Sequence, residues 1–315
     1  MSATLAYVTA ERIGEALTPA GAVGAVEEAL RAGLDPAVGP KRGILDVASG
    51  QLLLMPAETA SAVGVKVATV APANPERGLP RIQGVYVLFD AATLTPRALL
   101  DGTALTTLRT PAVSVAAVRP ALLRETGPLH LTVFGAGPQG TGHVDTVAGV
   151  IEGHRPLGTV THVVRDPSAV TGALREGAAL VAAGSPEAAE AVARAHVVVC
   201  ATGSGTPVFD SGLARPDVVV IAVGSHDTDR REVDGALVGR AQVVVEDVAT
   251  ALREGGDVVM AIAETDLTES DLIPMADVVT GRAVLSADRP VVFKSSGMPW
   301  EDVVVAEAVV ARLRG

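Results

Sequence analysis

Three glycines in the segment FGAGPQGTGH, residues 134–143, follow the spacing G-x-G-x-x-G. The segment comes after the apolar run LHLTVF and opens a stretch typical of a helix, which is the context of a dinucleotide-binding loop. There the first glycine allows a tight turn, the second lets the backbone reach a pyrophosphate, and the third lets helix and strand pack closely. Amide groups at the helix N-terminus then bind the phosphates. The alternative is a glycine-rich turn that serves packing alone. The predicted cofactor contacts are Gly135, Ala136, Gly137, Pro138, Gln139 and Gly140.

The segment THVVRD, residues 161–166, bears on the type of dinucleotide. An acid at the tip of this predicted strand would bind the ribose 2′-hydroxyl of NAD, whereas an arginine there can accommodate the 2′-phosphate of NADP. Val164 stands where the acid is expected, Arg165 follows it, and Asp166 comes one residue later. We therefore expect NADP(H) to be favoured over NAD(H), with Arg165 as the phosphate ligand. The alternatives are a solvated Arg165 and a shifted Asp166 that would select NAD.

Two further apolar segments, HVVVCAT and DVVVIAVG, end near residues that can meet the same cofactor. Ligands of such folds bind at the carboxyl ends of the strands, so we expect Thr202 and Val223 to be cofactor contacts. The six histidines of the sequence show no ligand spacing with cysteine or carboxylates, so we expect no metal site. We interpret Cys200 as a small, buried hydrophobic residue.

The elements that must position these residues change character along the chain. After Pro128 strands alternate with helices, which is typical of a parallel, doubly wound sheet. The predicted strands there are 129–135, 158–166, 178–184, 196–202, 217–224 and 241–247, and the predicted helices are 138–153, 167–177 and 185–195. Before residue 115 strand mostly follows strand, which indicates an α+β region with antiparallel pairing. A strand near residue 290 and a helix over 300–313 close the chain.

Length, charge and cysteine content limit the class of protein. The 315 residues are too many for one small core, so we expect two domains. A net charge of −11 and the lack of a dense Lys/Arg cluster argue against a nucleic-acid partner. The single cysteine cannot form an internal disulfide, which favours a reducing compartment. No apolar run reaches about 18 residues, and the N-terminus lacks the pattern of a signal peptide. We expect a cytoplasmic protein with no membrane partner.

Several sequence blocks occur in a fixed order: LMPAETA, GVKVATV, RGLPRIQGVYVLFDAATL, ALLDGTALTTLRTPAVS, VFGAGPQG, AVGSHDTDRREVD and VFKSSGMPWED. Together they resemble the ornithine cyclodeaminase/μ-crystallin family over about residues 40 to 305, and LLDGTALTTLRT is highly specific to that family. The resemblance implies a Rossmann domain, residues 119–289, inserted into an α+β domain made of residues 1–118 and 290–315. That α+β domain would bind the substrate and form a homodimer.

The resemblance also implies which residues bind a small amino-acid or imino-acid substrate. Arg42, Lys66 and Arg109 match the basic substrate residues of the family, and Lys66 would also be catalytic as a proton donor. An arginine can hold a carboxylate by two parallel hydrogen bonds, and a lone cation near apolar strands needs an anion. By the same match Thr110 would neighbour the cofactor phosphates. Gly297, in KSSGMPWED, would line the cleft. The alternatives are solvated charges for the three basic residues, an ordinary helix hydroxyl for Thr110 and a simple turn at Gly297.

The segment AVGSHDTDRREVD departs from the family pattern. Cyclodeaminase-like members carry an aspartate, a base that positions a water, two residues after the glycine that corresponds to Gly224. His226 stands at that place here, and Asp227 follows it. Imidazole and carboxylate differ in charge and working pH. We therefore expect His226 to be catalytic in imine reduction, with a non-catalytic His226 or an active Asp227 as alternatives.

The resemblance implies an NAD(P)H-dependent oxidoreductase that acts on the C–N bond of small amino or imino acids. Ketimine reductases, Δ1-pyrroline-2-carboxylate reductases and amino-acid dehydrogenases are of this kind. The first alternative is an ornithine cyclodeaminase, which converts L-ornithine to L-proline and ammonia. The second is a μ-crystallin-like binding protein that holds NADP. Steady NADPH consumption with a cyclic imino acid would separate the reductase from both.

Overall fold

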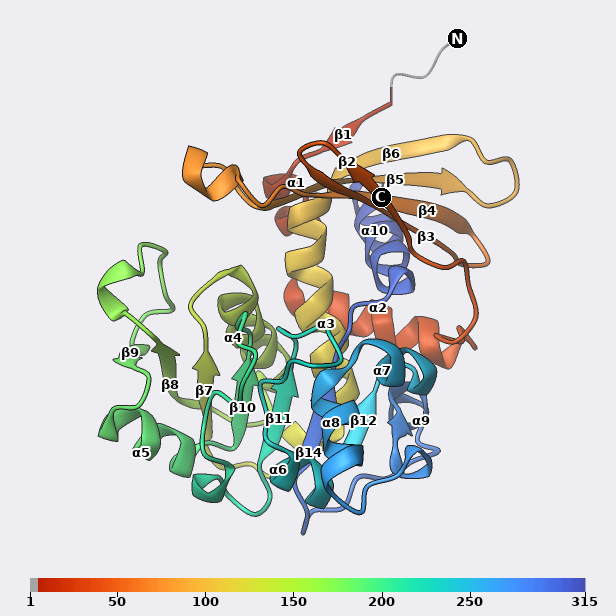
Figure 1. Ribbon diagram of the computed structural model, residues 1–315. Helices are drawn as coiled ribbons and strands as arrows, with labels where there is room; N and C mark the ends of the chain where they lie inside the picture. Colours follow the sequence, from red (N-terminus) through yellow and green to blue (C-terminus); the bar gives the residue numbers. More distant parts are fainter. Residues whose placement is uncertain (1–4, 315) are drawn as a thin grey trace. The chain divides into compact units, whose positions relative to one another are not determined.

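The computed structural model describes residues 5–314 (Figure 1). The chain forms two compact units: unit 1 comprises Met1–Thr110 and Met298–Gly315, and unit 2 comprises Pro111–Gly297. Unit 2 is therefore a single insertion into the chain of unit 1. No helix within residues 5–314 combines the length and the apolar character that crossing a membrane requires.

Unit 1 is built on a six-stranded sheet with the order β1-β6-β5-β4-β3-β2. Its strands are β1 (Tyr7–Val8), β2 (Gly43–Val47), β3 (Gly50–Glu58), β4 (Ala62–Val70), β5 (Ile82–Asp90) and β6 (Pro96–Asp101). β1 pairs parallel with β6, and all other neighbours pair antiparallel. The helices are α1 (Ala10–Ala16), α2 (Pro19–Arg31) and α10 (Pro299–Arg314). α10, blue in Figure 1, packs against β3, β4 and α2.

Strand β4 shows how the sequence positions a charged residue inside unit 1. Its residues alternate between buried and half-buried, the pattern of a strand with one face on the core. Small residues dominate the buried face, and Lys66 is the charged residue on it. α10 covers this strand, so it supplies the partners of Lys66.

Helix α3 (Gly102–Leu122) carries the chain from unit 1 into unit 2. The Asp101 side chain starts it by accepting hydrogen bonds from two backbone N–H groups of the first turn, each at 2.9 Å. Pro111 stands inside the helix, where it cannot donate to the carbonyl of the preceding turn. The predicted site residues Arg109 and Thr110 come directly before this proline, and both are buried.

Unit 2 contains an eight-stranded sheet with the order β13-β12-β14-β11-β10-β7-β8-β9, and every pair in it is parallel. Its strands are β7 (Leu129–Phe134), β8 (Leu157–Val164), β9 (Ala179–Ala182), β10 (Val197–Cys200), β11 (Val219–Ala222), β12 (Gln242–Val245), β13 (Ile273–Pro274) and β14 (Val291–Lys294). Its helices are α4 (Pro138–Ile151), α5 (Pro186–Arg194), α6 (Gly235–Arg240), α7 (Val248–Glu254), α8 (Gly256–Glu264) and α9 (Met275–Val279). From β7 the chain builds β8 and β9 on one side, and it then crosses back to place β10 on the other side of β7. A topological switch point therefore lies between β7 and β10.

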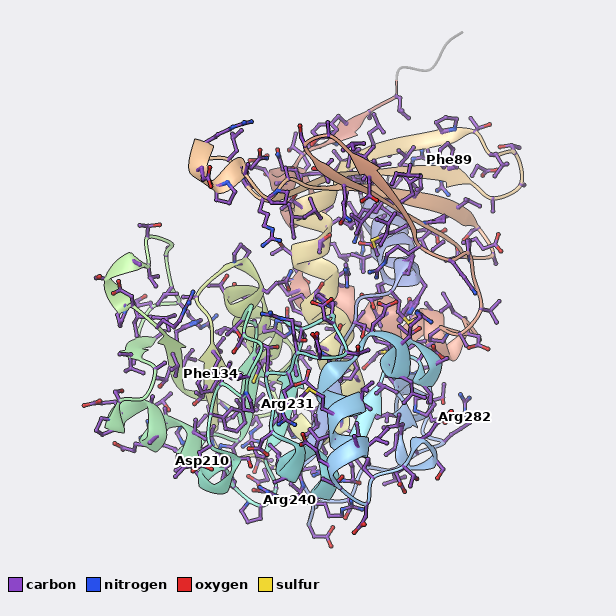
Figure 2. All side chains as sticks on the ribbon, viewed as in Figure 1. Phe89, Phe134, Asp210, Arg231, Arg240 and Arg282 are labelled. Carbon is purple, nitrogen blue, oxygen red and sulfur yellow. The ribbon has the colours of Figure 1, made fainter. Side chains whose placement is uncertain are left out.

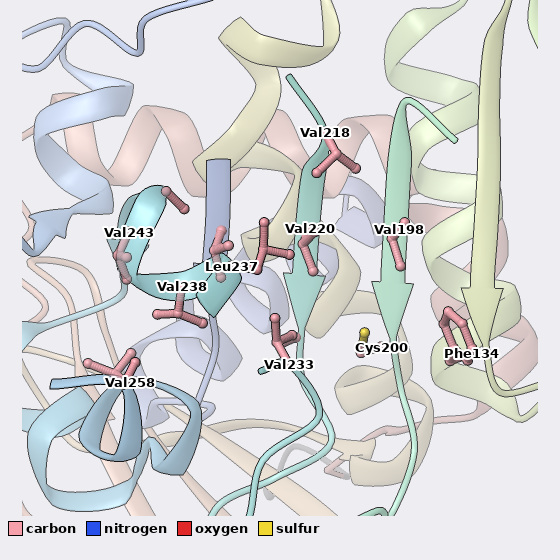
Figure 3. Packing of buried hydrophobic residues seen from close by; sticks show 14 of the residues in the cluster. Phe134, Val198, Cys200, Val218, Val220, Val233, Leu237, Val238, Val243 and Val258 are labelled. Carbon is pink, nitrogen blue, oxygen red and sulfur yellow. The ribbon is translucent and has the colours of Figure 1, made fainter. Parts of the chain in front are cut away.

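The core of unit 2 consists mainly of valine side chains from the central strands and the helices beside them (Figure 3). Val198 and Cys200 lie on β10, and Val220 lies next to them on β11. Cys200 is fully buried, which confirms its interpretation as a small hydrophobe. Burial raises the pKa of its thiol well above the ordinary value.

The structure differs from the sequence predictions at two places in unit 2. Residues 167–177 contain only the short 3₁₀-helix Pro167–Ala169, because two β-branched residues and a glycine follow it and disfavour a helix. The strand predicted near residue 290 exists as β14, but it pairs with β11 and β12.

The boundaries between the units also differ from those predicted. The second boundary falls after Gly297 rather than at 290, and the first falls after Thr110 rather than at 118. The predicted fold class, a Rossmann domain with a parallel sheet inserted into an α+β domain, is confirmed.

Candidate active site

The glycine loop lies between β7 and α4, at the switch point of the unit 2 sheet. Gly135 has a φ of 115°, and a Cβ there would lie 2.7 Å from the carbonyl oxygen of Ala201. A Cβ on Gly140 would lie 2.6 Å from the carbonyl oxygen of Gly135, so this glycine lets α4 approach the loop. By contrast, apart from its own chain neighbours, no described residue places an atom within 4 Å of a Cβ built on Gly137. The second glycine faces open space, which fits the approach of a pyrophosphate to the backbone.

Helix α4 begins on this open space. Gly137 is its N-cap residue, Pro138 occupies its first turn, and no side chain of residues 5–314 caps it. The positive end of the helix dipole is therefore directed at the open side of the loop. The loop and the helix end together fit the phosphates of a dinucleotide.

Two buried histidines, His143 and His162, form hydrogen bonds with backbone carbonyl groups of the glycine loop and of the start of α4. His143 Nδ1 donates to the carbonyl oxygen of Gln139 at 2.7 Å, and its Nε2 lies 3.1 Å from the hydroxyl of Ser114 on α3. His162 Nδ1 donates to the carbonyl oxygen of Gly135 at 2.9 Å. Burial lowers the pKa of His143 to about 4, so this imidazole is neutral at pH 7, and its Nε2 accepts a hydrogen bond from the Ser114 hydroxyl. These contacts were not predicted from the sequence.

A pocket of about 780 Å³ opens at the carboxyl ends of β7, β8 and β10, within the size range of small-molecule sites. Phe134, labelled in Figure 2, ends β7 at the pocket and stacks on Phe209 with ring centroids 5.5 Å apart. Three predicted cofactor residues line it: Gly135, Arg165 and Thr202. The other predicted cofactor residues lie outside its lining: Ala136, Gly137, Pro138, Gln139, Gly140, Thr110 and Val223.

Arg165 and Asp166 form part of the pocket wall after β8. Asp166 caps the 3₁₀-helix, because its Oδ1 accepts hydrogen bonds from the N–H of Ser168 at 2.9 Å and from the Ser168 hydroxyl at 2.6 Å. These bonds lower the pKa of Asp166. Arg165 is exposed, and no carboxylate of residues 5–314 lies within ion-pair distance of it. One oxygen of the acid is thus engaged in a turn, while the arginine charge faces the pocket unpaired.

Glu232 fastens the loop that follows β11 to the pocket wall. Its Oε1 accepts hydrogen bonds from the N–H and the hydroxyl of Thr202, both at 2.7 Å, and its Oε2 accepts from Gly224 N–H at 2.7 Å. Glu232 is fully buried, and burial raises its pKa although the three hydrogen bonds oppose the rise. The carboxylate therefore fixes the ends of β10 and β11 relative to each other.

A second buried charge supports the same loop. Lys294 Nζ donates to the carbonyl oxygen of Ser225 at 2.6 Å and lies 3.0 Å from Asp257 Oδ2. Asp257 Oδ1 in turn accepts from the N–H groups of Glu232 and Val233 at 2.7 and 2.8 Å. The predicted residue His226 directly follows Ser225 and is exposed, as is Asp227. Further along the loop Arg231, labelled in Figure 2, pairs with Glu264 at 2.6 Å. The loop with His226 is thus anchored at both ends.

Gly297 lies in a turn that a third buried carboxylate holds. Glu246, after β12, accepts hydrogen bonds from the Ser295 hydroxyl at 2.6 Å, from Ser296 N–H at 2.9 Å and from Gly297 N–H at 3.1 Å. Gly297 has a φ of 72°, which favours glycine at this position. The predicted site residue is therefore part of a rigid turn after β14.

Unit 1 brings two predicted substrate residues into one buried network. Lys66 Nζ lies 2.7 Å from Asp302 Oδ2 and 3.4 Å from the hydroxyl of Thr106. Arg109 pairs with Glu301 through Nη1, and its Nε lies 3.4 Å from Asp302 Oδ1. Both carboxylates are fully buried in the first turn of α10. The anions that balance these cations thus come from the chain itself, and sequence reasoning missed both of them.

The register of the sheet places Arg42 in the same row as Lys66. Gly43 pairs with Leu54, so Arg42 lies level with Met55, and Met55 pairs with Lys66. Two strand spacings separate Arg42 from Lys66, which is roughly 10 Å between backbones. The predicted basic trio therefore gathers on unit 1, while His226 and Gly297 belong to unit 2.

The electrostatics of the unit 1 network make Lys66 unusual. Burial lowers the pKa of Lys66, Asp302 opposes this shift, and the neighbouring Arg109 adds to it. A lysine with a lowered pKa can give up a proton more readily than an exposed one. Within residues 5–314 there is no group of three or more His, Cys, Asp or Glu side chains that could hold a metal ion.

Comparisons with known proteins agree with these features. The family described as "Ornithine cyclodeaminase/mu-crystallin family" matches residues 5–315. The Delta(1)-pyrroline-2-carboxylate reductase of Colwellia psychrerythraea is 30% identical over 87% of this chain and 89% of its own. A crystal structure of a probable ornithine cyclodeaminase from Bordetella pertussis is 30% identical, with a TM-score of 0.80 over 98% of this chain and 97% of that chain.

The fold is also that of the Delta(1)-pyrroline-2-carboxylate reductase of Thermococcus litoralis, whose structure contains NADH and L-proline. The TM-score is 0.84 at 24% identity, over 98% of both chains. The resemblance seen in the sequence is confirmed, since the match extends over nearly the whole chain. The protein belongs to the ornithine cyclodeaminase/mu-crystallin family.

Proposed function

We propose that the protein is an NAD(P)H-dependent reductase of the C=N bond in a small cyclic imino acid of the Δ1-pyrroline-2-carboxylate class. The observation that carries the proposal is the buried pairing of Lys66 with Asp302 beside Arg109, in a chain that also has a dinucleotide loop. The reaction class predicted from the sequence agrees with the name of the Colwellia relative. An acid for the nitrogen and cations for the carboxylate are what this reaction requires.

Each side chain has a distinct role in this reaction. Bound NAD(P)H supplies a hydride to the imine carbon, which becomes the α-carbon of the product amino acid. Arg109 and Arg42 bind the substrate carboxylate. The Lys66 ammonium donates a proton to the imine nitrogen and becomes a neutral amine, and a proton from solvent restores it. His226 is a second acid–base group, on the unit that carries the cofactor loop.

NADP(H) is proposed as the preferred cofactor. Arg165 lies on the pocket wall with an unpaired charge, and Asp166 uses one oxygen to cap a turn. A 2′-phosphate would meet a cation here, whereas a 2′-hydroxyl would compete with Ser168 for the acid. Arginine is well suited to phosphate because its donors match the phosphate oxygens.

A homodimer through the edge strand β2 is proposed as the assembly. β2 is the last strand of the unit 1 sheet, and its side chains Ile44, Leu45 and Val47 are 56%, 51% and 49% exposed. A hydrophobic edge strand of this kind invites pairing with another chain, and a second copy would cover it. A cytoplasmic location is proposed from the single, buried cysteine.

Ornithine cyclodeamination is the second candidate. It is favoured by the similarity to the probable ornithine cyclodeaminase of Bordetella pertussis and by Asp227, which directly follows His226 on an exposed loop. A binding protein that holds NADP without turnover is the third candidate. The charge network of unit 1 argues against a passive role, because buried ion pairs are costly to assemble.

A panel of substrates tests the proposal. The purified protein is mixed with NADPH or NADH and with Δ1-pyrroline-2-carboxylate, its six-membered homologue, pyruvate with ammonia, or L-ornithine, and cofactor absorbance and ammonia are followed. We expect steady NADPH oxidation with a cyclic imine and its loss in Lys66→Met. Ammonia release from L-ornithine without net cofactor turnover would instead establish the cyclodeaminase. If no substrate is turned over, the remaining candidate is the binding protein that holds NADP.

A further inference from the structure

Lysine is rare in this chain. The sequence has three lysines, Lys41, Lys66 and Lys294, among 25 basic Lys and Arg residues. Lys66 and Lys294 are buried, and each lies against a buried aspartate. Arginine gives a permanent charge, whereas lysine can release its proton. The use of lysine at a buried position in an arginine-rich chain therefore indicates a need for the smaller ammonium group or for its proton.

The surroundings of Lys66 come from three elements. α10 contributes Asp302 at 2.7 Å, and α3 contributes Thr106 at 3.4 Å together with Arg109. β5 contributes Tyr86, which pairs with Lys66 across the sheet and is fully buried. Of these neighbours Asp302 favours the charged lysine, Arg109 disfavours it, and Glu301 adds a weaker attraction. Burial raises the pKa of the Tyr86 phenol well above its ordinary value, so Tyr86 is neutral.

We infer that Asp302 is a positioning residue for Lys66: it fixes the ammonium group in the site and keeps it protonated until substrate arrives. The inference rests on the proposed imine reduction and adds a residue to it. Without Asp302, Lys66 would be a buried cation beside Arg109, and both burial and repulsion would drive its proton off. With Asp302, Nζ retains its proton and directs two of its three N–H groups at Asp302 and Thr106. The third can face a substrate nitrogen.

Glu301 serves a different cation and makes a matched control. Its carboxylate is as deeply buried as that of Asp302 and stands next to it in the first turn of α10. It pairs with Arg109, which stays charged at every pH an enzyme meets. The charge of Glu301 therefore acts mainly on an arginine, whereas the charge of Asp302, which also lies 3.4 Å from Arg109 Nε, acts mainly on a lysine that can titrate.

The titration of Lys66 can be measured directly because the chain has so few lysines. The full-length protein is labelled with ¹³C at the lysine Cε, and the three signals are followed from pH 6 to pH 11; Lys66→Arg assigns the signal. We expect Lys66 to be protonated at pH 8 in the wild type. In Asp302→Asn its titration should move to lower pH by about one to three units, the usual effect of one close opposite charge. In Glu301→Gln the shift should be clearly smaller.

Kinetics give an independent measure. In Asp302→Asn the alkaline limb of the pH profile of kcat/KM for Δ1-pyrroline-2-carboxylate should move to lower pH by the same amount. Glu301→Gln should raise KM and move the limb clearly less. Asp302→Glu, which restores the charge, should return the limb toward its wild-type position. A merely structural aspartate would lower stability without moving the limb.

Each outcome decides the matter. If Lys66 is neutral at pH 8 in the wild type, the inference is wrong. This test needs no variant, so it remains available even if Asp302→Asn folds poorly. Equal shifts in Asp302→Asn and Glu301→Gln would also overturn it. Because the NMR titration needs no substrate, a protein with no imine reductase activity would contradict the proposed function and leave the test of Asp302 intact.

Discussion

His143 links the cofactor loop to the stability of unit 2 through its protonation. The side chain is fully buried between Gln139 and Ser114, and burial lowers its pKa from 6.5 to about 4. The folded protein thus resists protonation that the unfolded chain accepts. The stability that neutral His143 provides is fully present above pH 6.5 and is lost as the pH falls toward 4.

The size of this loss follows from the difference between the two pKa values. About 2.5 units, at about 1.4 kcal/mol per unit, gives a total of about 3 kcal/mol. Roughly 2 kcal/mol of it should be lost between pH 7 and pH 5, where most carboxylates remain ionised. The matched variant is His143→Gln, which keeps an amide for hydrogen bonding and has no titratable group.

Urea unfolding followed by circular dichroism at pH 7, 6 and 5 measures the effect. His143→Gln should be less stable than the wild type at pH 7, because one hydrogen bond is lost, and the gap should narrow or reverse by about 2 kcal/mol at pH 5. The reasoning would be refuted by wild type and variant that lose stability in parallel. Such a result would mean that His143 takes up its proton over the same pH range in the folded and unfolded states.

Three further predictions concern the cofactor pocket and its supports. Arg165→Ala should weaken NADPH binding by about 1.5–3 kcal/mol, or roughly 10- to 100-fold, with little change for NADH; calorimetric titration that finds equal losses would contradict the assignment. Gly135→Ala should destabilise the fold by about 1–3 kcal/mol because of its φ and its contact with Ala201, whereas Gly137→Ala should weaken only dinucleotide binding; equal melting temperatures would speak against this. Lys294→Met should cost about 3–5 kcal/mol, because Asp257 is left buried without its cation, and an unchanged Tm would count against the ion pair.

The fold was largely predictable because its signals are local. The Val-rich segments and the spacing of the glycines both act within a few residues, and the structure has the strands and the glycine loop that they predict. The helix predicted at 167–177 is absent from the structure, which has only the 3₁₀-helix Pro167–Ala169 there. The β-branched residues and the glycine that follow have low helix propensity. The placement of β14 between β11 and β12 depends on pairing between distant segments, which no local pattern encodes.

The site was predictable only in part for the same reason. The family resemblance pointed to Lys66 and Arg109, but their partners Asp302 and Glu301 lie about two hundred residues away in the sequence. The acidic pair in PWED looks like ordinary acids at a helix start, which are favourable there without any partner. The supports of the loops, Glu232 and Glu246, likewise act through contacts with the backbone, and side-chain type alone does not reveal them.

The most direct test of the proposed function is to follow the hydride itself. NADPH that carries deuterium at the transferable position of the nicotinamide is incubated with the wild-type protein and Δ1-pyrroline-2-carboxylate, and the product is examined by NMR and mass spectrometry. The account predicts proline with one deuterium on its α-carbon for each NADPH consumed. Proline without deuterium, or formation of proline and ammonia from L-ornithine alone with NADPH unchanged, would contradict it.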